Sequence, residues 1–239
     1  MTSARCTVCG GTPTVWRTSL HDEVTCATHP VAVRCVFCGR GDADPRAAGW
    51  LALADGVHRC PTCAADAVNT QEQARKHLPV IRRDMAAMGL DLPERVLVRI
   101  VPYDEVAGLV GGPASGMLLG ATQQVIGGAG GRRVVEICVV AGLPELYFGR
   151  AVAHEIGHAW LGLRGATTVD DVVEEGTCEL FAYAWLKRRG TAMAEVLREQ
   201  MTRNPEPVYG GGFRLVHAAI RRHGVDTVLN GLLSTGRLP

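Results

Sequence analysis

The chain has 239 residues, of which 47% are hydrophobic, so it is long enough for one or two domains with a substantial core. Its 25 basic and 24 acidic residues leave a formal net charge of +1, which gives no electrostatic reason to expect a nucleic acid as partner. No apolar run approaches the roughly 18 residues of a membrane helix, and the first residues lack the apolar segment of a secretory signal. We therefore expect a soluble, cytoplasmic protein that does not bind a membrane.

Residues 1–65 form a cysteine-rich front, which holds seven of the nine cysteines. In a reducing compartment, cysteines clustered at paired spacing are metal ligands more often than disulfide partners. Together with one histidine they form four pairs, each with two residues between the partners: Cys6 and Cys9, Cys26 and His29, Cys35 and Cys38, Cys60 and Cys63. Eight such ligands fill two tetrahedral zinc sites that have no open position, which is typical of structural zinc.

Pairing in chain order is the simplest arrangement of these ligands. It assigns Cys6, Cys9, Cys26 and His29 to a first site and Cys35, Cys38, Cys60 and Cys63 to a second. A crossed pairing stays open, and His21 and His58 are spare ligands. The front lacks the dense basic run and aromatic series of nucleic-acid binders, so we expect it to serve as a scaffold or to contact a protein partner.

Residues 66–239 are predicted to form a second domain of the α+β class. Apolar residues at helical spacing predict a helix over 64–90, bent before Pro79. Residues 95–102 and 132–142 are predicted strands. The glycine-rich region between them predicts short strands or a hairpin around 116–126, with a flexible tip at 127–131.

The helix predicted over residues 145–163 contains the sequence His-Glu-Ile-Gly-His at 154–158. His154 and His158 lie four residues apart, so both imidazoles can face one metal ion. Glu155 is placed to hydrogen-bond a water molecule on that ion and to act as a base. The alternative is a pair of helix histidines beside an unrelated carboxylate.

A catalytic zinc site needs a third protein ligand and an open fourth position. A further helix is predicted over 170–186, and the spacing of Thr168 and Asp171 resembles a capping box at its start. We expect Glu175 to be the third ligand, with Glu174 as its competitor. Glu174 or Glu179 would then hold the ring N–H of a ligand histidine. The alternative is that these acids stabilise the helix N-terminus and face water.

Other residues near this motif have less certain roles. Tyr209, which precedes three glycines, is the candidate donor to an oxyanion, and an ordinary packing role is the alternative. Cys138 and Cys178 are predicted to be small core residues, although Cys178 competes as a metal ligand.

The segments around the motif resemble the DA-one family of gluzincin peptidases, which includes plant LIM-domain growth regulators and bacterial relatives. Three segments carry the resemblance: "AGLPELYFGRAVAHEIGHAWLGLRG", "VEEGTCELFAYAWL" and "PVYGGGFR". The front is similar to the family's LIM-like portion, notably in "CATHPVAVRCVFCGR" and "LADGVHRCPTCAADAV". The similarity runs in patches from about residue 26 to 225 and is poor over 90–130.

The resemblance implies a gluzincin-like peptidase domain, with a small mixed sheet and helices, after a LIM-like module with two structural zinc sites. By the same resemblance His154, His158 and Glu175 are the catalytic zinc ligands and Glu155 is the base. An extended protein or peptide substrate would lie along the strand 133–140. The family has Gln at the position of Glu179, so the resemblance does not support a histidine-binding role there. The expected cofactors are three zinc ions, and the alternative function is an inactive, zinc-stabilised adaptor that binds protein partners.

Overall fold

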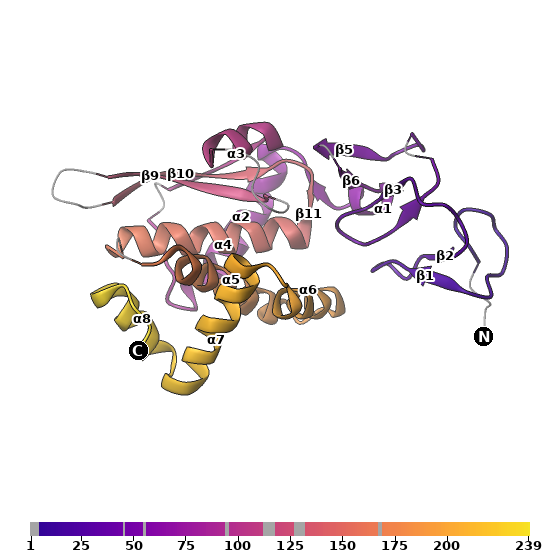
Figure 1. Ribbon diagram of the computed structural model, residues 1–239. Coiled ribbons are helices and arrows are strands. Elements are labelled where there is room, and N and C mark those ends of the chain that lie inside the picture. Colours follow the sequence, from indigo (N-terminus) through magenta and orange to yellow (C-terminus); the bar gives the residue numbers. More distant parts are fainter. Residues whose placement is uncertain are drawn as a thin grey trace. The chain divides into compact units, whose positions relative to one another are not determined.

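The computed structural model describes residues 5–44, 46–54, 56–93, 96–111, 118–126, 132–166 and 169–239 (Figure 1). The chain divides into two compact units. Unit 1 comprises Met1–Val68 and Gly142–Tyr147, and unit 2 comprises Asn69–Ala141 and Phe148–Pro239. The tip expected at 127–131 and the cap residue expected at 168 lie outside the described residues.

Short antiparallel ribbons make up the described part of unit 1. They are β1 (Trp16–Thr18) with β2 (Val24–Cys26), β3 (Val33–Arg34) with β4 (Gly41–Asp42), and β5 (Leu51–Ala54) with β6 (Val57–Arg59). The short helix α1 (Pro61–Ala64) follows β6, and the side chain of Cys60 accepts a hydrogen bond from the Cys63 backbone at its start. Such ribbons are too short to bury a large apolar core, so the unit depends on its cysteine clusters.

Residues 142–147 join unit 1 from far along the chain. The strand β7 (Ala67–Val68) pairs with β11 (Leu143–Pro144). The Arg59 side chain donates a hydrogen bond of 2.7 Å to the Gly142 carbonyl, and the Tyr147 hydroxyl donates one of 2.6 Å to the Phe37 carbonyl. Gly142 has a φ of +91°, a conformation that favours glycine. This pairing of distant segments could not be read from the sequence.

Unit 2 contains a mixed three-stranded sheet. Its strands are β8 (Leu97–Val101), β9 (Gly120–Ile126) and β10 (Arg132–Val140), in the order β8-β10-β9. The central strand β10 runs parallel to β8 and antiparallel to β9. The strands predicted at 95–102 and 132–142 are therefore confirmed, with small differences at their ends. Of the region around 116–126, where short strands or a hairpin were predicted, the described residues form the single strand β9. Among the described residues, β9 is paired on one edge only.

The helix predicted over 64–90 is shorter than expected. The observed helix, α2 (Gln71–Ala86), contains Pro79. It begins where it does because Thr70 and Gln73 form a capping box, in which each side chain bonds the other's backbone. The residues before it are used in β7. After β8, the short helix α3 (Tyr103–Leu109) leads toward β9.

The helix α4 (Glu145–Leu163) has the predicted bounds and packs on the sheet (Figure 1). A helix that is apolar on nearly all sides belongs in the interior, and most of α4 is buried. Its partly exposed polar residues within the buried stretch are Arg150, His154 and His158. Since they are four residues apart, they form one polar stripe along the helix.

The remaining helices lie on the side of α4 that is away from the sheet (Figure 1). They are α5 (Asp171–Arg189), α6 (Ala192–Arg203), the single π-helical turn η2 (Pro207–Gly211), α7 (Gly212–His223) and α8 (Val225–Thr235). The predicted helix at 170–186 is confirmed, but the capping residue is Asp170, whose carboxylate accepts the Val172 N–H at 3.0 Å. Leu180, Phe213, Val216, Val228 and Leu232 form the core between α5, α7 and α8.

Glycines let the helices around α5 approach closely. A Cβ atom at Gly149 would overlap the Trp185 ring, and one at Gly157 would lie 3.0 Å from the Cys178 sulfur. A Cβ atom at Gly176 would overlap the backbone of Gly212 at the start of α7. These three positions therefore set the distances from α5 to α4 and to α7.

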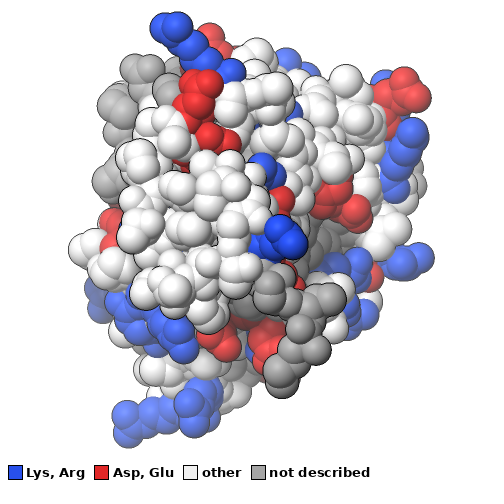
Figure 2. All heavy atoms as spheres, turned by 90° about the vertical axis from the view of Figure 1, so that its right-hand side faces the viewer, with Lys and Arg blue, Asp and Glu red and all other residues white. Residues whose placement is uncertain are grey.

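The surface carries charges of both signs. On the face shown in Figure 2, Lys and Arg side chains and Asp and Glu side chains lie among and around uncharged residues. None of the helices in the described part of the chain combines the length and apolar character needed to cross a bilayer.

The crossing of α5 and α7 yields a test. Gly176→Ala should lower the free energy of unfolding by about 1–3 kcal/mol or more, because the added methyl group meets backbone that cannot move aside. Gly108→Ala is the matched control, since Gly108 also lies in a helix but has open space around its Cα. It should change stability by no more than about 1 kcal/mol, in the stabilising direction. Urea unfolding of both variants compares them, and equal stability of the two would contradict the crossing.

Candidate metal centres

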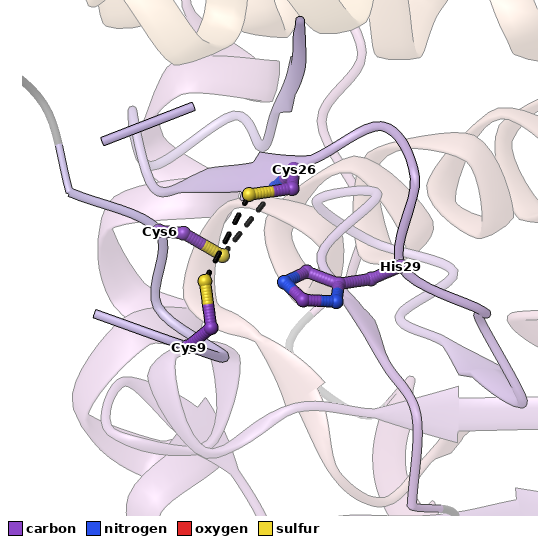
Figure 3. A group of neighbouring side chains, drawn as sticks. All are labelled: Cys6, Cys9, Cys26 and His29. Carbon is purple, nitrogen blue, oxygen red and sulfur yellow. Dashed lines mark hydrogen bonds between the residues drawn. The ribbon is translucent and has the colours of Figure 1, made fainter. Parts of the chain in front are cut away.

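The cysteines of unit 1 form two groups in chain order. Within each group, one donor atom per residue lies within 4.8 Å of all the others. The first group is Cys6, Cys9, Cys26 and His29; the second is Cys35, Cys38, Cys60 and Cys63. Figure 3 shows the first group, in which a ring nitrogen of His29 faces the three sulfur atoms.

The sulfur–sulfur distances suit tetrahedral zinc. Zinc–sulfur bonds of about 2.3 Å place two sulfur ligands about 3.8 Å apart. The Sγ atoms of Cys9 and Cys26 are 3.9 Å apart, and those of Cys38 and Cys60 are 3.6 Å apart. Both groups can therefore hold a zinc ion, and each offers four donors, which leaves no position for a substrate.

The two groups differ in exposure. All four cysteines of the second group are buried, whereas Cys9 in the first group is exposed. Burial raises the pKa of the Cys6 thiol, but backbone N–H groups, including those of Val8 and Cys26, bring that pKa down to about 6. Those N–H groups stabilise the thiolate, the form that binds metal.

The spare histidines of the front have different positions. The Nε2 atom of His21 lies 3.2 Å from the Cys63 sulfur, so His21 touches the second group without being one of its four donors. His58 forms an isolated bridge with Cys35 through its backbone and belongs to neither group.

A third group of donors lies in unit 2 and combines two helices. His154 and His158 come from α4, and Glu175 comes from α5. The two Nε2 atoms are 3.1 Å apart, and the Glu175 Oε2 atom is 3.1 Å from the first and 3.4 Å from the second. Tetrahedral zinc with bonds of about 2.0 Å requires such atoms to be about 3.3 Å apart. These three donors thus fit one zinc ion and leave a fourth position.

The other ring nitrogen of each histidine faces a carboxylate. The Nδ1 atom of His154 is 3.1 Å from Glu179, and that of His158 is 3.0 Å from Glu174. A proton on each Nδ1 leaves the lone pair of each Nε2 free for a metal ion. Glu174 is therefore engaged on the far side of the His158 ring, whereas Glu175 shares the donor face. Arg150 in turn contacts Glu179 at 3.1 Å.

Opposite charges overcome the cost of burial in this group. Burial raises the pKa of Glu179, but Arg150 and His154 bring it down to about 2. Burial also raises the pKa of Glu175, but the two histidines lower it more, so this pKa lies well below its usual range. Burial lowers the pKa of His154, yet Glu175 and Glu179 raise it to about 10. The imidazoles and carboxylates of this group therefore stabilise each other's charged forms, and a cation bound among them would offset the carboxylate charge in the same way.

The third group opens into a cavity of about 630 Å³. Glu155 lies in the cavity wall, with only 5% of its surface exposed. Tyr209, on η2, also lines the cavity, and its ring centre is 6.3 Å from that of His154. Burial and the nearby Glu175 raise the pKa of Tyr209 to about 12. Cys178 is fully buried beside this site but is not one of the grouped donors, and Cys138 is buried in β10.

The strand beside the cavity is not the one expected. Residues 133–140 belong to the central strand β10, which pairs with β9 over most of its length and with β8 over residues 136–140. Among the described residues, this strand therefore offers little free edge to a substrate. The cavity is lined instead by residues 120–124 of the edge strand β9. The error arose because local sequence predicts a strand but not its order in the sheet.

Two contributors to the cavity were missed in the sequence. Arg150 lies four residues before His154, so helical spacing alone could have placed it on the same face. Thr122 donates a hydrogen bond of 2.8 Å to the Glu155 carboxylate. Thr122 lies 33 positions before Glu155, and no local pattern marks it.

Comparisons with known proteins identify relatives of both units. A family model described as "DA1-like: Protein DA1" matches residues 63–196. Protein DA1 of Arabidopsis thaliana is 31% identical over 134 residues, which cover 44% of this chain and 25% of the relative. The LIM domain-containing protein HDR3 of Oryza sativa subsp. japonica is 24% identical over 277 residues, covering 88% of this chain and 55% of the relative.

Another relative, Protein DA1-related 1 of Arabidopsis thaliana, is 23% identical over 268 residues, covering 86% of this chain and 48% of that protein. The chain thus spans about half or less of the length of these curated relatives. No solved structure matches the chain.

The third donor of unit 2 can be tested directly. Glu175→Ala should lower the zinc content by one ion per chain, because it removes one of three donors. Glu174→Gln should keep that ion, since an amide oxygen can still accept the His158 N–H. Asp171→Ala, an exposed acid on the same helix, is the control. Metal analysis after gel filtration measures the content, and loss in Glu174→Gln but not in Glu175→Ala would contradict the assignment.

The two groups of unit 1 should release zinc at different rates. A chelator should take zinc from the exposed first group faster than from the buried second group, because it reaches Cys9 without unfolding. Cys9→Ser should remove the fast phase, whereas Cys138→Ser, which alters a buried cysteine outside the groups, should retain it. A coloured chelator follows release, and a single phase in the wild-type front would contradict this order.

Proposed function

Because the chain belongs to the DA1-like family and carries a three-donor metal group in a cavity wall, we propose that it is a zinc-dependent endopeptidase of the gluzincin type. The proposal rests on one observation above the others. Three donors from two helices converge at distances that suit zinc, with Glu155 in the same cavity. A site built for stability alone would be closed by a fourth protein donor.

The proposed reaction is hydrolysis of a peptide bond by water. A zinc ion held by His154, His158 and Glu175 would supply Lewis-acid activation of the water and of the carbonyl group. The Glu155 carboxylate accepts a proton from the attacking water and then delivers it to the departing amine nitrogen. Glu155 thus returns, within one turnover, the proton that it accepted.

Tyr209 is the proposed donor to the developing oxyanion. A tyrosine hydroxyl is protonated at neutral pH, and the rise in the pKa of Tyr209 to about 12 keeps it so, which lets it donate a hydrogen bond. The turn η2 that carries Tyr209 is held by Glu206, whose carboxylate accepts the Tyr209 N–H at 2.6 Å. Tyr209 lies outside the segment matched by the family model.

The substrate is proposed to pair with the free edge of β9. Unpaired backbone N–H and C=O groups on an edge strand can bind an extended peptide without selecting particular side chains. Such a mode suits an unfolded or exposed segment of a protein.

Unit 1 is proposed to hold two structural zinc ions and to contact a partner or substrate protein. One relative that aligns over most of the chain is named a LIM domain-containing protein, and the two closed donor groups are consistent with a LIM-like module. The chain would then hold three zinc ions, one of them catalytic.

Glu155→Gln tests the proposal. It should lower kcat/KM by about 100-fold to 10,000-fold, because the amide cannot accept the proton, while the zinc content stays unchanged. The measurement is cleavage of a fluorescently labelled unfolded test protein by the zinc-loaded chain. Glu195→Gln, which alters an exposed acid on α6, is the control and should retain full activity.

Two outcomes would contradict the peptidase. One is equal cleavage by the wild type and the Glu155→Gln variant. The other is no cleavage by a fully zinc-loaded wild type, which would favour an adaptor that binds protein partners without cleaving them.

A further inference from the structure

Thr122 on the edge strand β9 is the hydrogen-bond donor to the Glu155 carboxylate. Its hydroxyl oxygen lies 2.8 Å from Oε2 of Glu155 and 3.0 Å from the backbone carbonyl oxygen of the same residue. Within the described parts of the chain, Glu155 forms no ion pair, in contrast to Glu175 and Glu179 in the same cavity. The orientation of Glu155 therefore depends on a neutral group.

Gly120 controls the space beside the other carboxylate oxygen. A Cβ atom at Gly120 would lie 3.0 Å from Oε1 and 2.9 Å from Cγ of Glu155. Both residues line the cavity. The strand β9 thus places the Thr122 hydroxyl beside Oε2 of Glu155 and, at Gly120, leaves room beside Oε1.

The position of β9 along α4 is fixed by its alternate residues. In a strand, residues 120, 122 and 124 share a face. Gln124 donates a hydrogen bond of 3.2 Å to the His158 carbonyl, and a Cβ atom at Gly162 would overlap the Gln124 side chain. The strand is therefore held in register with the helix that carries the metal-binding histidines.

We propose that Thr122 is a positioning residue for Glu155, a role that rests on the proposed peptidase function. Its hydroxyl has one proton and two acceptors within reach. When Glu155 is ionised, the hydroxyl donates to Oε2. When Glu155 carries the proton taken from water, the hydroxyl turns to the backbone carbonyl and offers its lone pair to the acid.

This arrangement suits a base that must take up and release a proton in each turnover. A cationic partner would stabilise only the ionised carboxylate, whereas a hydroxyl can satisfy both protonation states. No proton is gained or lost by Thr122, since it donates and accepts in turn. The strand proposed to bind the substrate also holds the base, so binding and proton transfer share one element.

Kinetics of substitutions at Thr122 test the proposal. Thr122→Val removes the hydroxyl at similar volume and should lower kcat by about 10-fold to 100-fold, the value of a hydrogen bond to a charged group. KM should change by less than about twofold, because the substrate is bound by backbone groups. Thr122→Ser restores the hydroxyl and should recover kcat to within about threefold. Zinc content and melting temperature are measured for each, and Thr122→Ala replaces the valine variant if that variant does not fold.

A binding measurement supplies a readout that does not depend on turnover. A peptidyl hydroxamate chelates zinc and shares its hydroxyl proton with a neighbouring carboxylate. Thr122→Val should weaken its binding to the zinc-loaded chain about 10-fold, but should have no further effect in the Glu155→Gln background, because both residues act through the same carboxylate. Gln124→Met, which removes the other strand–helix hydrogen bond, should lower kcat less than Thr122→Val does.

The outcomes separate this proposal from the peptidase itself. If Glu155→Gln abolishes cleavage while Thr122→Val keeps full kcat, the positioning role is overturned and the peptidase stands. If Thr122→Val and Gln124→Met lower kcat and melting temperature equally, Thr122 is a structural residue only, and the proposal is again overturned. If Glu155→Gln cleaves as well as the wild type, both proposals fall together.

Discussion

The close contact between α4 and α5 is the constraint on which the cavity of unit 2 depends. Gly149 and Gly157 let the two helices approach, and only then can Glu175 reach the two imidazoles from the neighbouring helix. Three lone-pair donors within 3.1–3.4 Å of one another repel unless a cation or protons lie among them. The packing of apolar side chains between α4 and α5 therefore keeps these three donor atoms close together despite their mutual repulsion.

Residues on α4, α5 and β9 contact these donors and the neighbouring Glu155. Glu174 and Glu179 on α5 each lie beside the Nδ1 atom of one histidine, and Arg150 on α4 contacts Glu179 in turn. Thr122 on β9 holds Glu155, which faces the cavity from α4 itself. Preorganisation of this kind places each group before a ligand arrives, so little reorganisation is needed when charge develops. The sheet, two helices and the turn η2 must all be in place for the cavity to exist.

The sequence predicted local features well and relations between elements poorly. Helical periodicity predicted the bounds of α4 and placed His154 and His158 on one face of it. The two-residue spacing within each pair identified the cysteine ligands. The roles of neighbouring acids were harder to predict, because Glu174 and Glu175 point about 100° apart on the helix. Only the crossing with α4 decides which of them meets the Nε2 atoms and which meets the Nδ1 atom of His158. The order of the strands and the return of residues 142–147 to unit 1 depend on distant pairing, which leaves no local pattern.

The two units use metal donors in opposite ways. In unit 1, each group offers four donors, mostly cysteine sulfur atoms, and the short ribbons between them have little other core. Binding energy there can go only into folding. Unit 2, in contrast, buries an extensive apolar core between its helices and sheet. The carboxylates of five residues line the cavity: Glu155, Glu174, Glu175, Glu179 and Glu206. Among its described lining residues, Arg150 supplies the single guanidinium. A divalent cation offsets that excess of negative charge, and with only three donors engaged it retains a position for chemistry.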